Sequence, residues 1–365
     1  MIRVVTIVGA RPQFVKAAVV SRAIEEHNQT ARAGSLRISE FLLHTGQHYD
    51  ERMSGAFFTD LKIKNPDVNL NVGSGGHGET TAEMLKGIEK VLLQEKPHVL
   101  MVYGDTNSTL AGALAAAKLQ IPVAHVEAGL RSFNQAMPEE INRVLTDHIS
   151  RLLFCPTLLA VSNLEREGIT KGVLQAGDVM FDAALIFSKL AEENPILNKL
   201  GVTPKSFVLC TFHRANNTDD PIRLRGLLSG LQQVARTTPV IFPVHPRTSK
   251  VIASLALRDL CPDVRMIEPL GFLEMAKLEK AASVILTDSG GVQKEAYFYR
   301  TPCVTIRDET EWVELLESGW NTLCPPMPEQ IMKAVIQAGP GHHDPDYGSG
   351  DAGRKIVKGL LNFCS

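Results

Sequence analysis

Three carboxylates in the first half of the chain stand where hydrophobic runs end. Asp105 and Glu127 follow the runs 97–102 and 121–126, and Glu139 begins the next helical segment. Parallel strands bring their carboxyl ends to one edge of a sheet, so these side chains are expected on one rim. Carboxylates that share a rim repel one another and raise the pKa of at least one, which suits proton transfer. Taken singly, each fits a helix cap or a surface acid better.

A metal site is the alternative interpretation of the three carboxylates. Oxygen ligands suit a hard cation such as magnesium, which the sequence leaves open. Proton transfer is the interpretation we adopt, and we expect no metal at the predicted site.

Two basic residues accompany the carboxylates. Arg11 follows the β-branched run 4–8, and Lys16 lies about one turn into the helix expected over 13–27. A strand that ends in glycine and leads to Arg-Pro at a helix start is typical of a parallel α/β sheet. Arg11 then projects at the edge where open α/β folds bind ligands. The alternative for Arg11 is a solvated surface cation.

An anion-binding turn is predicted in the second half of the chain. A buried run ends at Asp288 and Ser289, which are both helix N-cap types, and Gly290 and Gly291 follow. A helix that begins here points free N–H groups and its positive dipole end at a ligand. Glu295 lies one to two turns further, within reach of sugar hydroxyls. The alternative is an ordinary strand-to-helix turn.

The second half offers three more candidate contacts after its hydrophobic runs. His213 follows the run 207–211, and Phe272 and Arg307 stand after later runs. A lone histidine is usually structural. His245 occupies an equivalent strand end, and this repetition favours a functional role for His213.

Two successive βα series predict two doubly wound α/β domains that face one another across a cleft. The first domain is predicted over 1–170 and the second over 171–349, with a polar, proline-containing boundary region at about 170–200. A final helix within 350–365 is expected to pack back on the first domain.

Composition excludes several classes of protein. The 365 residues are 44% hydrophobic and 21% charged with a net charge of −2, which is unlike a disordered chain or a dedicated nucleic-acid binder. The six cysteines form no CxxC pair, so we expect reduced thiols in a cytoplasmic protein. The N-terminus has no signal-peptide pattern, and no apolar run reaches the ~18 residues that span a bilayer.

The motifs together resemble those of the non-hydrolysing UDP-N-acetylglucosamine 2-epimerases, in order and spacing and over nearly the whole chain. They are Gly9-Ala10-Arg11-Pro12, Tyr103-Gly104-Asp105-Thr106, His125-Val126-Glu127-Ala128-Gly129-Leu130-Arg131, Pro138-Glu139-Glu140-Ile141-Asn142-Arg143, His213-Arg214 and Thr287-Asp288-Ser289-Gly290-Gly291-Val292-Gln293-Lys294-Glu295.

The resemblance implies the GT-B fold, in which two Rossmann-like domains face a central cleft. It implies reversible conversion of UDP-N-acetylglucosamine to UDP-N-acetylmannosamine for cell-surface polysaccharides. UDP leaves by anti elimination through a 2-acetamidoglucal and then adds back, and no cofactor takes part. The family further implies a homodimer in the cytoplasm, whose ligands are the UDP-sugar and UDP.

The resemblance also assigns roles to residues. It implies that Asp105, Glu127 and Glu139 are catalytic, without saying which takes the C2 proton, and that His213 is catalytic or contacts phosphate. The implied diphosphate contacts are Arg11, Ser289, Gly290 and Gly291, and the implied ribose contact is Glu295. Lys16, Arg143, Phe272 and Arg307 complete the predicted substrate contacts.

Three positions depart from the commoner family pattern. Trp312 replaces an arginine, which Arg307 would partly replace, and Gln13 replaces a glutamate. Tyr49 replaces an arginine beside Gln47 and His48, in a loop that the family links to a second, activating UDP-N-acetylglucosamine.

The first and second departures resemble a branch that includes UDP-2,3-diacetamido-2,3-dideoxyglucuronate 2-epimerases of O-antigen synthesis. A substrate with a C6 carboxylate needs an extra cation, for which Lys16, Arg131 and Arg143 are candidates.

This uronate epimerase is therefore the alternative function. Alternatives of other classes are a GT-B glycosyltransferase, a sugar-nucleotide sensor without catalysis and a hydrolysing epimerase.

Overall fold

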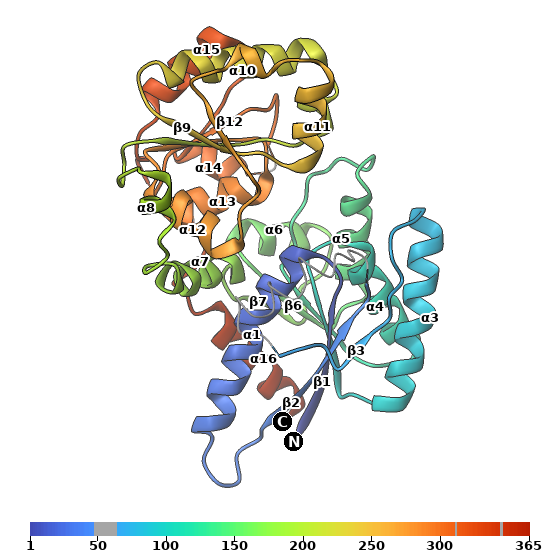
Figure 1. The fold of residues 1–365 in the computed structure, drawn as a ribbon. Coiled ribbons are helices and arrows are strands. Elements are labelled where there is room, and N and C mark those ends of the chain that lie inside the picture. The colour runs from blue at the N-terminus through green and yellow to red at the C-terminus, as the bar shows by residue number, and fades with distance from the viewer. Residues whose placement is uncertain (47–63, 311, 344–345) are drawn as a thin grey trace. The chain divides into compact units, whose positions relative to one another are not determined.

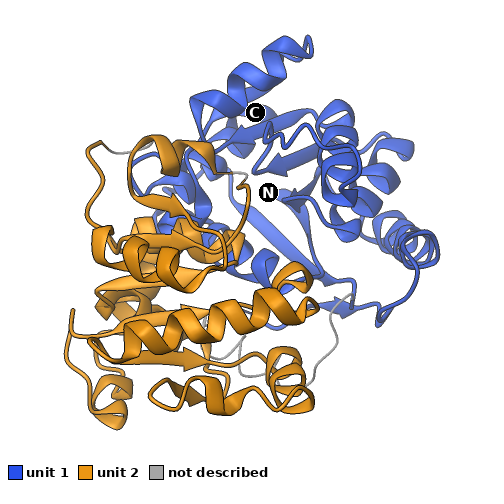
Figure 2. Cartoon of the chain, turned by 90° about the horizontal axis from the view of Figure 1, so that it is seen from above, with its two compact units in different colours: residues 1–183, 346–365 blue, residues 184–345 orange. Residues whose placement is uncertain are grey.

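The computed structural model describes residues 1–46, 64–310, 312–343 and 346–365. The chain divides into two compact units (Figure 2). Unit 1 is Met1–Ala183 with Asp346–Ser365, and unit 2 is Ala184–Pro345. No helix in the described ranges is long and apolar enough to cross a membrane.

Unit 1 contains a sheet of seven parallel strands in the order β3-β2-β1-β4-β5-β6-β7 (Figure 1). Its strands are β1 (Ile2–Val8), β2 (Ile38–His44), β3 (Val68–Asn69), β4 (Val99–Tyr103), β5 (Val123–Val126), β6 (Leu152–Cys155) and β7 (Val173–Gln175). Its helices are α1 (Arg11–Thr30), α3 (His77–Glu95), α4 (Asn107–Lys118), α5 (Pro138–Ile149), α6 (Leu158–Arg166) and α16 (Ala352–Cys364), and α7 (Val179–Leu190) begins in this unit.

The central strands of unit 1 are buried because helices cover both faces of the sheet. Every residue of β4 and β5 is buried, as the continuous apolar runs predict for parallel strands. The alanine-rich α4 packs closely between α3 and α5, while α16 packs against α1. The predicted doubly wound α/β architecture of this unit is therefore confirmed.

Unit 2 repeats the arrangement with six parallel strands in the order β10-β9-β8-β11-β12-β13. Its strands are β8 (Val208–Thr211), β9 (Val240–Pro243), β10 (Arg265–Ile267), β11 (Val284–Thr287), β12 (Cys303–Thr305) and β13 (Asn321–Leu323). Its helices are α8 (Ile196–Leu200), α9 (Ala215–Thr218), α10 (Pro221–Ala235), α11 (Pro246–Ser254), α12 (Phe272–Ala281), α13 (Gly290–Phe298), α14 (Val313–Glu317) and α15 (Pro328–Gln337), with a 3₁₀ turn at Arg258–Leu260.

The unit boundary lies inside α7 after Ala183, within the boundary region predicted at about 170–200 but later than residue 170, where the first domain was predicted to end. The physical reason is β7, a strand of three residues that pairs with β6 and extends the first sheet. A strand this short carries no readable alternation, and the same holds for β13 in unit 2. The C-terminal helix α16 belongs to unit 1.

We expect the close approach of α16 to be sensitive to side-chain volume. A Cβ atom added at Gly359 would lie 2.6 Å from Cε1 of the buried Phe154 ring. Gly359→Leu should therefore lower the free energy of unfolding by about 2–3 kcal/mol through overpacking. Urea unfolding followed by circular dichroism measures the change.

The matched control is Gly78→Leu in α3, where an added Cβ meets nothing within 4 Å. This variant should unfold at the urea concentration of the wild type or slightly above it, since leucine favours helix more than glycine does. Equal destabilisation of the two variants would contradict a tight α16 interface.

Candidate functional site

The candidate site of unit 1 lies beside β1, where the strand order of the sheet reverses. β1 pairs with β2 on one side and with β4 on the other. In open α/β sheets such a reversal leaves a crevice at the carboxyl ends of the strands. The turns that follow β1, β4 and β5 carry the predicted residues.

Gln13 joins the turn after β1 to the turn after β4. Its side-chain oxygen accepts hydrogen bonds from the backbone N–H groups of Gly9 and Ala10, at 2.8 and 3.0 Å. Its amide group donates to the Tyr103 carbonyl at 2.8 Å and to the hydroxyls of the threonines that begin α4. Gln13 is 1% exposed, so these bonds replace water and fix both turns.

Glu127 forms an ion pair with Lys16 of α1. A Cβ atom added at Gly104 would lie 3.2 Å from the Lys16 ammonium and 3.3 Å from a Glu127 carboxylate oxygen. The turns after β4 and β5 therefore meet at this ion pair. Glu127 has φ +74°, a left-handed conformation that costs energy for a residue with a side chain. Such strain gathers at functional sites because the surrounding structure must hold it.

Asp105 forms an ion pair with Arg143 of α5. Its backbone carbonyl accepts a hydrogen bond from the Asn142 amide at 2.9 Å. Each of the carboxylates Asp105 and Glu127 thus has a cation as its partner. For these two carboxylates the repulsion expected on a shared rim is offset, because α1 and α5 supply the two opposite charges.

The adjacent glutamates of α5 differ in position. Glu139 is exposed in the first turn, whereas Glu140 is 3% exposed and accepts hydrogen bonds from the backbone of Ser132 and Phe133, at 2.8 and 2.9 Å. Arg143 contacts Glu140 as well, at 3.1 Å. Glu140 therefore fixes the loop before α5, and Glu139 remains the accessible candidate of the pair.

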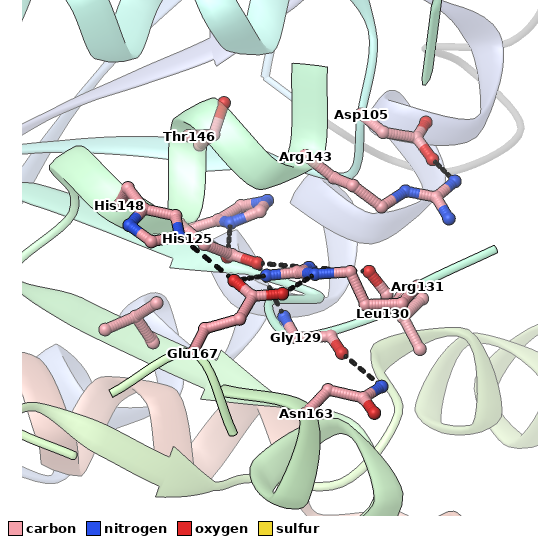
Figure 3. Close-up of polar contacts among 12 residues, drawn as sticks. Asp105, His125, Gly129, Leu130, Arg131, Arg143, Thr146, His148, Asn163 and Glu167 are labelled. Atoms are coloured by element: carbon pink, nitrogen blue, oxygen red, sulfur yellow. Dashed lines mark hydrogen bonds and ion pairs between the residues drawn. The ribbon is translucent and has the colours of Figure 1, made fainter. Parts of the chain in front are cut away.

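A buried ion-pair network lies beneath these turns (Figure 3). Asp147 of α5 contacts His125 of β5 at 2.7 Å and Arg131 at 2.7 Å. Arg131 continues to Glu167 through two parallel bonds of 2.6 and 2.8 Å, and His148 contacts Glu167 at 3.0 Å. The Arg131 side chain is 1% exposed, so it is not available to a substrate carboxylate as the sequence suggested.

The network has consequences for titration. Burial opposes ionisation of Asp147, but its contacts with His125 and Arg131 outweigh burial and lower the pKa of this carboxyl. The hydrogen bonds from Arg131 lower the pKa of Glu167. Burial raises the pKa of the neighbouring Cys155 thiol to about 12, so this cysteine is not a nucleophile at neutral pH.

The candidate site of unit 2 lies at the equivalent reversal, where β8 pairs with both β9 and β11. Asp288 follows β11 and is fully buried. Its carboxylate accepts hydrogen bonds from the backbone N–H groups of His213 and Arg214 at 3.0 Å, and from the Asn217 amide at 3.0 Å. Asp288 therefore ties the turn after β8 to the turn after β11, rather than capping α13 as its type suggested.

Helix α13 begins at Gly290 with Ser289 as its N-cap residue. The Ser289 side chain makes no cap hydrogen bond, and a Cβ added at Gly291 would meet only the Ser289 hydroxyl, at 3.9 Å. An anion can approach the backbone N–H groups here, where the helix dipole is positive.

Trp312 contacts the turn at the start of α13. Its indole N–H donates to the Gly290 carbonyl at 2.9 Å, and the Lys294 ammonium lies 4.4 Å from the centre of its ring. The residue that departs from the family pattern thus contacts the backbone of the anion-binding turn.

The other predicted residues of unit 2 are distributed as follows. His213 is exposed beside His245, with ring centres 5.5 Å apart. Burial, and then His213 and Arg247, lower the pKa of His245. Glu295, Arg307 and Phe272 are half-buried, and the Phe272 ring packs edge-on against Phe187 at 5.0 Å.

Two further predictions concern the N-terminal part of the chain. Arg11 is exposed at the start of α1. Gln47, His48 and Tyr49 of the predicted activating loop lie outside the described residues. Within the described residues, no group of three or more His, Cys, Asp or Glu side chains is placed to hold a metal ion.

Sequence reasoning missed the residues that position the site: Gln13, His125, Asp147 and Asp288. Each is a buried polar residue at or next to a strand end, and each is paired. A polar residue inside an otherwise apolar run, such as His125, was the available signal.

The chain is similar to known proteins in both sequence and structure. A family model described as UDP-N-acetylglucosamine 2-epimerase matches residues 31–361. A UDP-N-acetylglucosamine 2-epimerase homolog of Methanococcus maripaludis is 49% identical over 99% of this chain and 100% of its own. The UDP-2,3-diacetamido-2,3-dideoxy-D-glucuronate 2-epimerase of Pseudomonas aeruginosa is 48% identical over 99% of this chain and 100% of its own.

Among solved structures, the Methanocaldococcus jannaschii UDP-GlcNAc 2-epimerase in complex with UDP-GlcNAc and UDP is 44% identical. It aligns with a TM-score of 0.85 over 99% of this chain and 100% of its own. The GT-B-like fold, with one Rossmann-like sheet in each unit, is confirmed. The chain therefore belongs to the UDP-N-acetylglucosamine 2-epimerase family.

Proposed function

We propose that the protein interconverts UDP-N-acetylglucosamine and UDP-N-acetylmannosamine by inverting C2 of the sugar. The observation that carries the proposal is the meeting of the turns after β4 and β5, each with a carboxylate paired to a cation. The relative crystallised with UDP-GlcNAc and UDP supports the choice of substrate.

The reaction requires a base that removes a proton from C2, a carbon with no neighbouring carbonyl group. The C2 proton is very weakly acidic, so its removal must accompany loss of UDP from C1. The C–H electron pair becomes the C1=C2 bond, and the C1–O electron pair leaves with UDP. Delivery of a proton to the opposite face of C2 and return of the UDP oxygen to C1 complete the inversion. Electrons and atoms balance without a redox cofactor.

The residues of unit 1 supply the proton transfers in this proposal. Asp105, Glu127 and Glu139 share the roles of base and acid. The ion pair with Lys16 presents Glu127 as a carboxylate, the form that accepts a proton. Arg11 and Lys16 are the proposed cations for the diphosphate.

The residues of unit 2 hold the nucleotide in this proposal. Ser289, Gly290 and Gly291 receive the diphosphate at the start of α13, and Glu295 accepts the ribose hydroxyls. His213, exposed at the end of β8, is the proposed additional contact to the departing phosphate or acid for it.

The second candidate substrate is UDP-2,3-diacetamido-2,3-dideoxyglucuronate, which the Pseudomonas aeruginosa relative favours. Its C6 carboxylate needs a cation. Arg131 is excluded by its buried ion pairs, so Lys16 and Arg143 are the remaining candidates of the three.

Deuterium exchange at C2 tests the reaction and the substrate together. We expect the protein in deuterated water to replace the H2 proton of UDP-N-acetylglucosamine and to form the manno epimer, read by proton NMR. The diacetamido-uronate is incubated in parallel, and exchange only with that sugar would transfer the assignment to it. Exchange with neither sugar would exclude both epimerase functions, as a transferase or a sensor leaves C2 untouched.

The control for this measurement is Glu127→Gln, which keeps the shape of the side chain but removes its basicity. Exchange should fall by about 10²–10⁴-fold, the usual contribution of a general base. Circular dichroism must show that the variant is folded, since its Lys16 loses a partner. Wild-type exchange in folded Glu127→Gln would exclude Glu127 from the proton transfers.

The contact of Trp312 with the anion-binding turn yields a separate expectation. Trp312→Phe keeps the ring beneath Lys294 but removes the indole N–H that holds the Gly290 carbonyl. One hydrogen bond contributes about 1 kcal/mol, so the dissociation constant of UDP should rise by about five-fold. Isothermal titration calorimetry measures it.

Trp320→Phe is the matched control, because among the described residues the Trp320 indole N–H has no hydrogen-bond partner. Its affinity for UDP should equal that of the wild type. If Trp312→Phe also binds UDP normally, the indole contact does not position the turn.

A further inference from the structure

His125 lies between two oxygen acceptors in the interior of unit 1. Its Nδ1 atom is 2.7 Å from a carboxylate oxygen of Asp147, and its Nε2 atom is 2.8 Å from the carbonyl oxygen of Gly104. The side chains of His125 and Asp147 are fully buried. Water is therefore not available to replace either contact.

The donor count determines the charge of the ring. A carbonyl oxygen only accepts hydrogen bonds, so Nε2 must carry a proton to bond with Gly104. A neutral imidazole has one N–H, which would leave a bare Nδ1 lone pair facing the Asp147 oxygen. Turning the ring over would place C–H groups against both oxygens. Protons on both nitrogens satisfy both contacts, and the ring is then an imidazolium.

A proton on Asp147 instead of His125 would have to sit on the oxygen that faces Nδ1. The other oxygen of this carboxyl accepts hydrogen bonds from Arg131 at 2.7 Å and from the Gly129 backbone at 3.1 Å. Both donors stabilise the carboxylate form, and the guanidinium does so with a full charge. These contacts favour an ionised Asp147 that faces two cations.

The charges of the whole network support the same state. With an imidazolium at His125, two cations alternate with the two carboxylates Asp147 and Glu167 (Figure 3). With a neutral His125, the fully buried Asp147 would share the charge of Arg131 with Glu167 and would be compensated only in part, which is costly away from water.

The pair holds the two turns that carry the candidate carboxylates. The hydrogen bond from His125 holds the carbonyl of Gly104, the residue directly before Asp105. The hydrogen bond to Asp147 holds the N–H of Gly129, two residues after Glu127. The N–H group of Gly104 also donates to the Val126 carbonyl at 3.0 Å. Both the N–H and the carbonyl of Gly104 are therefore bonded to residues of β5.

We propose that His125 is an imidazolium that serves as a positioning residue, holding Asp105 and Glu127 in register through its pair with Asp147. It touches neither substrate nor the reacting atoms. The role rests on the proposed use of Asp105 and Glu127 in proton transfer. The charge state of the ring, however, is measured without substrate, so the two can fail separately.

Charged and titratable groups lie close to the ring. Asp147 faces it from α5, and Arg131 contacts Asp147 from the loop after β5. On the neighbouring strand β6, burial raises the pKa of the Cys155 thiol to about 12, so this thiol stays protonated. Next to Gly104, Lys16 and Glu127 form their own ion pair.

Nitrogen NMR of protein labelled in the histidine rings tests the charge state, and His125→Gln assigns the signal. We expect both ring nitrogens of His125 to carry protons in the wild type, as its two contacts require. In Asp147→Asn one of the two ring protons should be lost. A wild-type ring with a single N–H would overturn the proposal.

Kinetics of the UDP-sugar that the wild type turns over test the positioning role. In His125→Gln, kcat should fall by about 10²-fold while KM stays within about three-fold, because misplacement affects the reacting groups more than nucleotide binding. The double variant with Asp147→Asn should be no slower than the slower single variant, since both act through one pair.

His148→Gln is the matched control, because this histidine is half-exposed at the outer end of the same network. Its kcat should equal that of the wild type. Positioning by His125 is excluded if folded His125→Gln keeps the wild-type kcat. It is also excluded if kcat falls and KM rises by similar factors. If His125→Gln does not fold, the wild-type and Asp147→Asn spectra decide the charge state, and Asp147→Asn kinetics decide the role.

Discussion

The reversal of strand order beside β1 and beside β8 is the constraint on which the candidate site depends. Right-handed crossovers place the helices of oppositely growing series on opposite faces of a sheet, so the loops separate where the two series start. That separation leaves the carboxyl ends of the central strands uncovered. Arg11 and Asp105 follow the two strands at the reversal of unit 1, and His213 and Ser289 follow those of unit 2. Each pair can therefore present its side chains to a ligand of its own unit.

Beneath these accessible ends the polar groups are buried, and each has to be paired. Gln13 and Asp288 satisfy backbone groups of two turns at once, and the pair of His125 and Asp147 does so with charges. Such pairing holds a conformation that the chain would not adopt alone, as the positive φ of Glu127 shows. The candidate residues at the strand ends thus rest on a layer of buried polar residues that keep the turns in place.

The family is that of UDP-sugar 2-epimerases. In unit 2, Trp312 holds the backbone of the anion-binding turn through its indole N–H. In unit 1, Lys16 and Arg143 are each balanced by a carboxylate, Glu127 and Asp105. A ligand with an additional negative charge would have to compete with these carboxylates for the two cations.

The sequence by itself determined the class of fold and the positions of the accessible residues. Continuous apolar runs, glycine-containing turns and amphipathic helices are local patterns, so β1, β4 and the start of α13 were readable from short stretches of chain. The short strands β7 and β13 were not readable, because their pairing comes from neighbouring strands. The partners of the site residues were decided only by the tertiary structure. Arg131 looked like a ligand for substrate until it proved to be buried between Asp147 and Glu167, since an ion pair depends on distances that sequence spacing does not contain.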